Sequence, residues 1–262
     1  MDVSSSFVVD TTAPTINGAS TSSTGKYTNA STYISVSDSG SGAEALYMKA
    51  PGSSYYSNVG TSTTVSSTAT NGLYYFYAKD KAGNTSSTYY LYLDTSKPTG
   101  TIKNSSGTVI SGYTNGAFSY TATDTGSGVS YLQYKKPGSS SWLSYTSGTT
   151  IASTATNGQY QFRAVDKAGN VSDTQTIYLD SAAPTGTIKN SSGTAISGYT
   201  GGAFSYTATD TGSGVSYLQY KTPGSSSWTT YSSGTTISAS ATNGLYQFRA
   251  VDNAGNTSAV SS

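Results

Sequence analysis

The sequence lacks two residue types on which much enzyme and metal chemistry depends. Its 262 residues include no cysteine and no histidine, and Glu44 is the only glutamate. The absence of cysteine excludes disulfides and thiolate metal sites. The absence of histidine removes the commonest general base and the commonest transition-metal ligand. Together these absences argue against an enzyme.

Charge and long apolar runs are also scarce. The 13 basic residues balance 12 acidic ones, for a net charge of +1, and no basic cluster stands out. The electrostatic footprint of a nucleic-acid-binding protein is therefore missing. No apolar run approaches the roughly 18 residues that a membrane span requires. We expect neither a nucleic-acid partner nor membrane insertion.

Serine, threonine, glycine and tyrosine dominate what is present. The 24 tyrosines and a regular alternation of apolar residues favour folded β structure over disorder. Avoidance of cysteine together with abundant serine and threonine fits an extracellular bacterial protein. We therefore expect a protein that is secreted or held on the bacterial cell surface.

One unit occurs three times along the chain. The segments SDSGSG, TDTGSG and TDTGSG place Asp38, Asp124 and Asp210 at equal intervals of 86 residues (124 − 38 and 210 − 124). This period is a domain length and exceeds that of solenoid or propeller repeats. The predicted domains are residues 10–93, 94–179 and 180–262, preceded by residues 1–9.

Each unit reads as about seven short strands separated by turn signals, which is typical of a β-sandwich. In the second unit, Phe118, Tyr120 and Ala122 alternate on one face. Tyr160, with its counterparts Tyr74 and Tyr246, follows an Asn-Gly turn, where immunoglobulin-like sandwiches carry a tyrosine corner. The predicted fold is all-β: three tandem immunoglobulin-like (Ig or fibronectin type III) β-sandwich domains, arranged as an elongated rod.

The order of the motifs VDTTAPT, D-x-G-S-G, W-x-x-Y and NG-x-Y-x-F-x-A-x-DKAGN-x-S resembles the bacterial immunoglobulin-like repeats of surface proteins and adhesins. The resemblance covers almost the whole chain. It implies extracellular sandwiches strung in tandem, usually as a stalk that holds a binding domain away from the cell, and calcium at the domain joints of some members. Unit one departs from the pattern, since Tyr56 replaces the tryptophan and Val59 replaces Tyr145.

Nine aspartates occupy three equivalent places in each unit. In an immunoglobulin-like sandwich these places lie at one pole, so each set of three should gather at the end that faces the preceding domain. Clustered carboxylates are plausible calcium ligands at the joints, whereas aspartates that only cap their own turns would look the same in sequence. Both interpretations stay open, and calcium is the only cofactor that this pattern suggests. The residues are Asp10, Asp38, Asp80, Asp94, Asp124, Asp166, Asp180, Asp210 and Asp252.

Aromatic residues on neighbouring segments form a second candidate site. Stacking faces of this kind bind glycans or host and cell-surface proteins, and a patch of exposed aromatics marks such a site. The alternative is that they cover the edge of the sandwich, as tyrosine commonly does in strands. The residues are Tyr131, Trp142, Tyr145, Tyr217, Trp228 and Tyr231.

The two ends of the chain complement each other. Phe7, Val8 and Val9 align with the strand-forming residues Ile177, Tyr178 and Leu179, and unit three stops at NTSAVSS without an equivalent strand. One explanation is a piece cut from a longer array, slightly off the domain border. The other is donor-strand exchange, in which residues 1–9 complete unit three of another molecule by head-to-tail self-association.

The sequence therefore predicts a non-enzymatic extracellular structural or adhesive repeat region, a stalk or spacer, of a bacterial surface or secreted protein. A carbohydrate- or host-protein-binding module that uses the exposed tyrosines and tryptophans is the first alternative. A self-assembling fibre subunit is the second.

Overall fold

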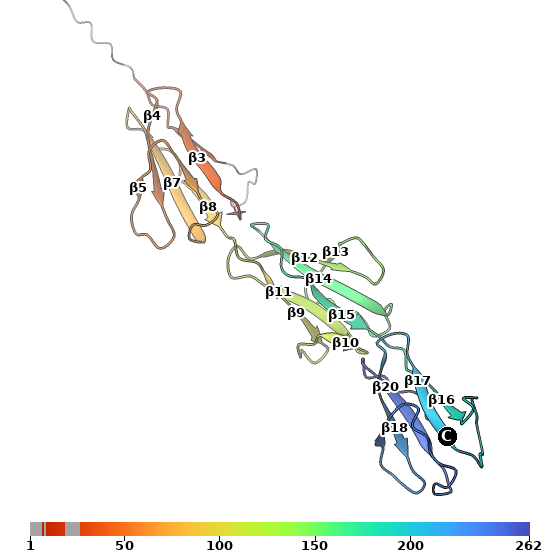
Figure 1. Cartoon of the computed structure of the whole chain (residues 1–262). Coiled ribbons are helices and arrows are strands. Elements are labelled where there is room, and N and C mark those ends of the chain that lie inside the picture. Colours follow the sequence, from red (N-terminus) through yellow and green to blue (C-terminus); the bar gives the residue numbers. More distant parts are fainter. Residues whose placement is uncertain (1–6, 8, 19–26) are drawn as a thin grey trace, which may run out of the picture. The chain divides into compact units, whose positions relative to one another are not determined.

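The computed structural model describes residues 7, 9–18 and 27–262, so Val8 of the expected donor strand lies outside the described residues. Within these ranges every regular element is a β-strand (Figure 1). The all-β prediction of tandem sandwiches is therefore confirmed. No described helix is long and apolar enough to cross a membrane.

The chain separates into two compact units, and the boundary between them runs through the middle of the second sequence repeat. The first unit comprises Met1–Gly100, Ala122–Leu132 and Arg163–Asp173, and the second comprises Thr101–Thr121, Gln133–Phe162 and Thr174–Ser262. The domain borders expected from the sequence repeat thus stay a prediction. We use repeat 1, repeat 2 and repeat 3 for residues 10–93, 94–179 and 180–262.

Repeat 1 folds into a sandwich of two sheets. One sheet has the order β1-β3-β6 and the other β2-β8-β7-β4-β5. Between them lies a core that includes Ile34, Leu46, Phe76 and Leu91, so the predicted alternation places one face of the longer strands β3, β7 and β8 inside. The strands are β1 (Thr15–Gly18), β2 (Tyr27–Thr28), β3 (Thr32–Ser37), β4 (Ala43–Lys49), β5 (Ser57–Asn58), β6 (Ser62–Val65), β7 (Gly72–Asp80) and β8 (Tyr89–Leu93).

Repeat 2 has the same plan, with sheets β11-β9 and β10-β15-β14-β12-β13. Aromatic rings dominate its core, where Tyr120 and Phe162 stack with centroids 5.0 Å apart. The strands are β9 (Thr99–Asn104), β10 (Gly112–Thr114), β11 (Phe118–Thr123), β12 (Val129–Lys135), β13 (Leu143–Tyr145), β14 (Gly158–Asp166) and β15 (Gln175–Leu179).

Repeat 3 has fewer strands, in sheets β16-β17 and β19-β18-β20. Its core repeats the aromatic pair of repeat 2 as Tyr206 and Phe248, 5.0 Å apart. The strands are β16 (Thr185–Asn190), β17 (Phe204–Thr209), β18 (Val215–Lys221), β19 (Thr229–Tyr231) and β20 (Gln247–Asp252). The segment equivalent to β10, residues 198–200, forms no strand here, and Phe248 of β20 forms a bridge with Ser261.

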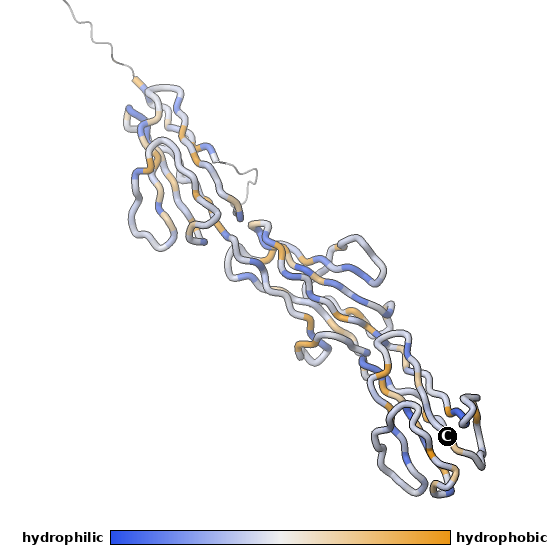
Figure 2. Tube along the Cα trace, in the orientation of Figure 1, coloured by the Kyte–Doolittle hydropathy of each residue, from blue (hydrophilic) through white to orange (hydrophobic). Residues whose placement is uncertain are grey.

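Tyrosine takes the place of aliphatic side chains in much of this structure. The trace in Figure 2 is mostly pale, with orange confined to short stretches, because few residues are strongly apolar. The predicted tyrosine corner is present in two repeats. The Tyr74 hydroxyl donates to the Thr70 carbonyl at 2.9 Å, and the Tyr160 hydroxyl to the Thr156 carbonyl at 3.0 Å.

Candidate functional site

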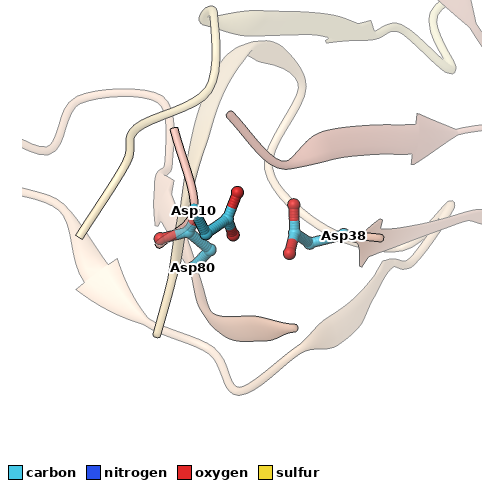
Figure 3. Close-up of side chains that lie close together, drawn as sticks. All are labelled: Asp10, Asp38 and Asp80. Atoms are coloured by element: carbon cyan, nitrogen blue, oxygen red, sulfur yellow. The ribbon is translucent and has the colours of Figure 1, made fainter. Parts of the chain in front are cut away.

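The three equivalent aspartates of each repeat lie together. In repeat 1, one carboxylate oxygen from each of Asp10, Asp38 and Asp80 falls within 4.8 Å of the other two, and the same holds for the sets in repeats 2 and 3. Figure 3 shows Asp38 reaching toward Asp10 and Asp80 from the opposite side. The predicted gathering of these residues is confirmed, and calcium binding itself stays a prediction.

The middle aspartate of each set closes the loop that follows its strand. Asp38 comes directly after β3, and its Oδ2 accepts hydrogen bonds from the N–H groups of Gly40 at 3.0 Å and Gly42 at 2.8 Å. Gly42 has φ of 86°, in the left-handed region that glycine favours. The D-x-G-S-G motif is therefore a turn that its own carboxylate caps.

The last aspartate of each set belongs to the hairpin turn DKAGN, which reads DNAGN in repeat 3. Asp80 ends β7, and Asn84 binds it twice, through its N–H to Oδ1 at 2.8 Å and through its side-chain amide to Oδ2 at 2.7 Å. Gly83 supplies the left-handed conformation in the turn, with φ of 91°. The Asp80 carboxylate therefore caps its own turn, and whether it also binds calcium stays a prediction.

The asparagine of DKAGN has a second role that the sequence did not reveal. Its side-chain amide also reaches the backbone carbonyl of the first aspartate of the set. Asn84 donates to the Asp10 carbonyl at 3.0 Å, and Asn170 donates to the Asp94 carbonyl at 2.8 Å. In the sequence, the only sign of this second role is that the asparagine recurs in all three copies. A hairpin turn alone is enough to explain that recurrence.

The first aspartate lies at the joint, the junction between consecutive repeats. Strand β8 ends at Leu93, and Asp94 follows at once with 0% exposure. Its N–H donates to the Thr28 carbonyl of repeat 1 at 2.9 Å. Its Oδ2 accepts the Ser127 N–H of repeat 2 at 2.6 Å. One buried residue thus bonds to the repeat before it and to the repeat after it.

The next joint has the same design. Asp180, also 0% exposed, donates its N–H to the Thr114 carbonyl at 2.9 Å and accepts the Ser213 N–H at 2.6 Å. Asn256 donates to its carbonyl at 2.8 Å. Because the two joints share every one of these bonds, the arrangement follows from the repeated sequence.

At each of the two joints, the asparagine of an Asn-Gly turn accepts a hydrogen bond from the residue that follows the joint aspartate. The Asn71 side-chain oxygen accepts the Thr95 N–H at 3.2 Å, and the Asn157 side-chain oxygen accepts the Ser181 N–H at 3.1 Å. Asn71 belongs to repeat 1 and Thr95 to repeat 2. The chain therefore crosses the joint with its backbone groups already paired.

The surroundings of Asp10 and Asp94 favour the ionised form of these two carboxylates. The backbone N–H of Ser41, followed by that of Thr12, lowers the pKa of Asp10 below its ordinary value. Burial alone would raise the pKa of Asp94, but hydrogen bonds from Ser127 and Ser96 outweigh it and lower that pKa as well. A catalytic general acid needs a raised pKa, whereas the pKa values of Asp10 and Asp94 are lowered.

Most of the acceptor capacity of each cluster is already used. Both oxygens of Asp10 and both of Asp80 accept hydrogen bonds, whereas Asp38 uses only Oδ2. Its Oδ1 is buried and has no partner among the described residues. The clusters therefore cap their own loops, and in repeat 1 the buried Oδ1 of Asp38 is left for a ligand.

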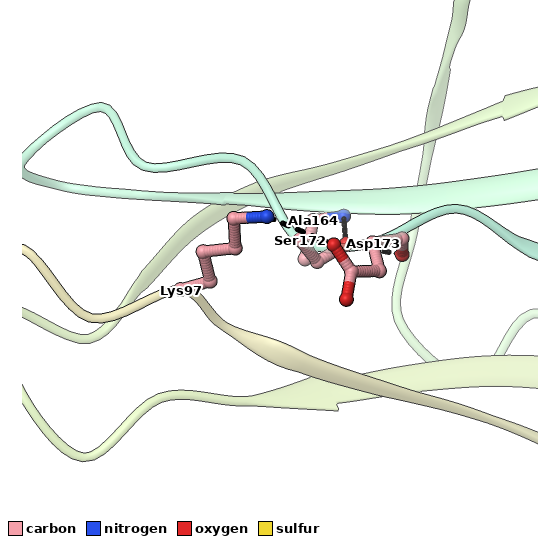
Figure 4. Close-up of polar contacts among 4 residues, drawn as sticks. All are labelled: Lys97, Ala164, Ser172 and Asp173. Atoms are coloured by element: carbon pink, nitrogen blue, oxygen red, sulfur yellow. Dashed lines mark hydrogen bonds and ion pairs between the residues drawn. The ribbon is translucent and has the colours of Figure 1, made fainter.

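The remaining acidic residue of repeat 2 forms an exposed ion pair. Lys97 Nζ lies 2.9 Å from Asp173 Oδ1 (Figure 4), and both side chains are mostly exposed. Beside it the Ser172 hydroxyl accepts the Ala164 N–H at 2.9 Å. Exposed pairs contribute little to stability, typically below about 1 kcal/mol. Asp173 therefore serves as an exposed control position for substitutions of the buried aspartates.

The aromatic candidate site needs a correction. Tyr131 and Tyr217 are exposed as expected, but Tyr145 and Tyr231 are buried at 8% and 5% exposure. The Tyr145 hydroxyl accepts the Tyr120 N–H at 2.9 Å and donates to the Thr149 carbonyl. In W-x-x-Y the tyrosine lies on the short edge strand, and its ring packs into the core. These two rings are not available to a ligand.

The tryptophans are half-buried, and cations already stack on them. Lys135 Nζ lies 4.9 Å from the Trp142 ring centroid. Over Trp228, Lys221 Nζ lies at 4.8 Å and the Arg249 guanidinium carbon at 4.3 Å. These stacked side chains compete with a sugar for the same faces. Ligand binding by the aromatic residues stays a prediction, with Tyr131 and Tyr217 as its exposed members.

Comparisons with known proteins give only distant likenesses. No family model and no curated protein matches the chain. Among solved structures, the fibronectin(III)-like modules of Clostridium thermocellum CbhA are 14% identical, over 63% of this chain and 92% of that one, with a TM-score of 0.34. The FN1–FN3 domains of chicken CNTN1 are 16% identical, over 90% and 94%, with a TM-score of 0.32. Trypsin-activated alpha-2-macroglobulin from Escherichia coli is 10% identical, over 94% and 22%, with a TM-score of 0.23.

Proposed function

We propose that the chain is a non-enzymatic spacer made of tandem sandwiches whose joints are held by buried aspartates, within a secreted or surface protein of a bacterium. The observation that carries this role is the pair Asp94 and Asp180. Each is fully buried and bonds to both of the repeats that it joins.

Stiffness across a joint depends on the residues that are free to rotate there. Domains in one chain are expected to move relative to each other unless the contact between them is extensive. Here no residue lies between the end of β8 and Asp94. Asparagine side chains of both repeats hydrogen-bond to the backbone at this joint. Asn71 of repeat 1 accepts the Thr95 N–H, and Asn170 of repeat 2 donates to the Asp94 carbonyl. Such a joint favours a spacer over a flexible linker.

The extracellular and bacterial parts of the proposal have compositional support. The chain has no cysteine and is rich in serine and threonine, and its motif order resembles that of bacterial surface repeats. The experiment that tests the spacer role is a measurement of how widely distances across a joint are distributed. We expect a narrow distribution in the wild type and a broad one when Asp94 loses its carboxylate.

A second candidate role is calcium binding at the aspartate clusters. The observation that favours it is the buried, unpartnered Oδ1 of Asp38, within a set of three carboxylates whose atoms lie within 4.8 Å of one another. Calcium binds six to eight oxygens at about 2.3–2.6 Å. Oxygens around one ion are then no more than about 5 Å apart, which the clusters satisfy.

Calcium binding predicts heat and stabilisation when protein treated with EDTA is titrated with calcium chloride. We expect a rise in melting temperature that Asp38→Asn reduces and that Asp173→Asn, outside every cluster, leaves unchanged. Calorimetry measures the binding heat, and a thermal scan measures the shift. Absence of both the heat and the shift in the wild type would rule out this role and leave the aspartates as turn caps.

A further inference from the structure

The outer face of one sheet in repeat 1 is covered by tyrosine. Strands β8, β7, β4 and β5 are neighbours in this sheet (Figure 1). Along β7, the core residues Tyr74, Phe76 and Ala78 alternate with residues that point away from the core. Strands β4 and β8 alternate in the same way. We call the surface that results the tyrosine face, and its residues are Tyr27, Tyr47, Tyr56, Tyr75, Tyr77, Tyr90 and Tyr92.

The rings of the tyrosine face contact one another across the strands. Tyr47 and Tyr77 stack with centroids 4.7 Å apart, and Tyr56 meets Tyr77 edge-on at 4.8 Å. Two further pairs, towards β8 and β2, have centroids 5.4 Å and 5.6 Å apart. Tyr90 is 49% exposed, and the other six residues are exposed or half-buried. The face is therefore a single aromatic surface that solvent reaches, and such patches mark interaction sites.

The sandwich does not require tyrosine at these places, as repeat 3 shows. Tyr47 and Tyr77 correspond there to Gln219 and Arg249, whose side chains hydrogen-bond to each other at 2.8 Å. Strands β18 and β20 nevertheless pair in the register of β4 and β7. Repeat 2 also has glutamine and arginine at these two positions. The tyrosines of repeat 1 therefore serve something other than strand pairing. None of the six aromatic residues that the sequence singles out belongs to this face.

A lysine lies among the rings of the tyrosine face. Lys49 Nζ is 4.3 Å from the Tyr75 ring centroid and 5.5 Å from that of Tyr56. The pairing of β4 with β7 places Lys79 on the same face, whereas Glu44 lies in a bulge of β4. The charge that this pairing brings to the tyrosine face is therefore positive, which complements a ligand that carries carboxylates.

We propose that the tyrosine face of repeat 1 binds an extended polysaccharide that carries carboxylates. The C–H faces of the sugar rings stack on the tyrosine rings, and the sugar hydroxyls pair with the tyrosine hydroxyls. A sugar carboxylate pairs with Lys49. An apolar protein surface would instead leave tyrosine hydroxyls buried without partners.

The tyrosine face is large enough that its lysine leaves rings for a ligand. Lys49 lies opposite Tyr75, and the face continues to Tyr77 on one side and to Tyr92 on the other. Trp228, by contrast, has two cations stacked on a single ring system. A polymer that crosses the strands can therefore contact several rings of repeat 1 at once.

Calorimetric titration of the full chain with polygalacturonate, in EDTA so that calcium takes no part, tests this proposal. The wild type should bind the polymer. The variant with Tyr47→Gln, Tyr75→Gln and Tyr90→Thr carries the residues that repeat 2 has at the same places, so the sheet accepts them, and a thermal scan checks its fold. It should bind at least about tenfold more weakly, because a few aromatic anchors dominate binding energies. The matched control, Tyr131→Ser with Tyr217→Ser, removes exposed tyrosines of the other repeats and should bind like the wild type.

Two further polymers separate stacking from charge. The wild type should bind fully methyl-esterified polygalacturonate more weakly than the free acid, and Lys49→Gln should remove that difference. Polyglutamate, which has carboxylates but no sugar rings, should not bind. The proposal is overturned by a wild type that does not bind polygalacturonate, by equal binding of the triple variant, or by equal binding of polyglutamate, which would indicate an acidic polypeptide as the partner. Each of these results would leave the spacer role intact, because that role concerns the joints.

Discussion

Replacing Asp94 by alanine is expected to lower the free energy of unfolding by about 3 kcal/mol. The substitution removes the acceptor of the Ser127 N–H, at 2.6 Å, and of the Ser96 N–H, at 3.0 Å. Ser127 is buried, so its N–H would lose its partner in a place that water reaches poorly. An unsatisfied buried donor costs about 1–3 kcal/mol, and bonds to an ionised acceptor lie at the upper end.

Chemical denaturation followed by tyrosine fluorescence measures this loss. Asp94→Asn, which keeps the shape and one oxygen acceptor, should recover part of it. The exposed residue Asp173 gives the matched control, and Asp173→Ala should cost less than about 1 kcal/mol. Equal losses from Asp94→Ala and Asp173→Ala would show that the buried aspartate does not stabilise the joint.

Gly126→Ala should be similarly damaging, at about 3 kcal/mol, although it adds only a methyl group. A Cβ at this position would lie 2.3 Å from Asp94 Oδ2 and 2.5 Å from its Cγ. Because the Asp94 carboxylate is buried and bonded to the Ser127 N–H, we expect the new atom to displace it from that N–H. Gly212 faces Asp180 at the same distances, and Gly212→Ala should therefore have the same effect on the second joint.

Gly116→Ala is the matched control for Gly126→Ala. The nearest atom to a Cβ at Gly116 is Thr114 Oγ1, at 3.8 Å, and neither glycine has positive φ. Replacement of a glycine by alanine at such a site is neutral or stabilising, by up to about 1 kcal/mol. Thermal scans of the two variants separate the effect of the clash from that of the lost glycine. If both variants melt like the wild type, Asp94 is not packed as tightly as described.

The fold and the gathering of the aspartates could be predicted because both follow from the repeat. Asp38, Asp80 and Asp10 each stand at a strand end or at the start of a repeat, and sandwich topology brings those places to one pole. The role of Asn170 could not be predicted in the same way. Its amide contacts both its own turn and the Asp94 carbonyl, and the distance to a residue 76 positions away is set by the fold alone.

The error over Tyr145 and Tyr231 has a different origin. Strand β13 has three residues, too few for a period of two to indicate which face is buried. The sequence of the W-x-x-Y motif therefore predicts an aromatic surface, although its tyrosine belongs to the core. The buried hydroxyl, which bonds to the Tyr120 N–H, shows why tyrosine occupies this place: the ring packs inside while its oxygen satisfies a backbone group.

The central claim, that a buried aspartate restrains each joint, is tested most directly by a distance distribution across one joint. Spin labels on Tyr33→Cys of repeat 1 and Tyr131→Cys of repeat 2 occupy exposed sites in a chain without other cysteines. A pair within repeat 1, Tyr33→Cys and Tyr90→Cys, gives the width that the labels alone produce. The account predicts that the wild-type distribution across the joint is nearly as narrow as this reference, and that Asp94→Ala broadens it. A wild-type distribution already as broad as that of Asp94→Ala would contradict the account.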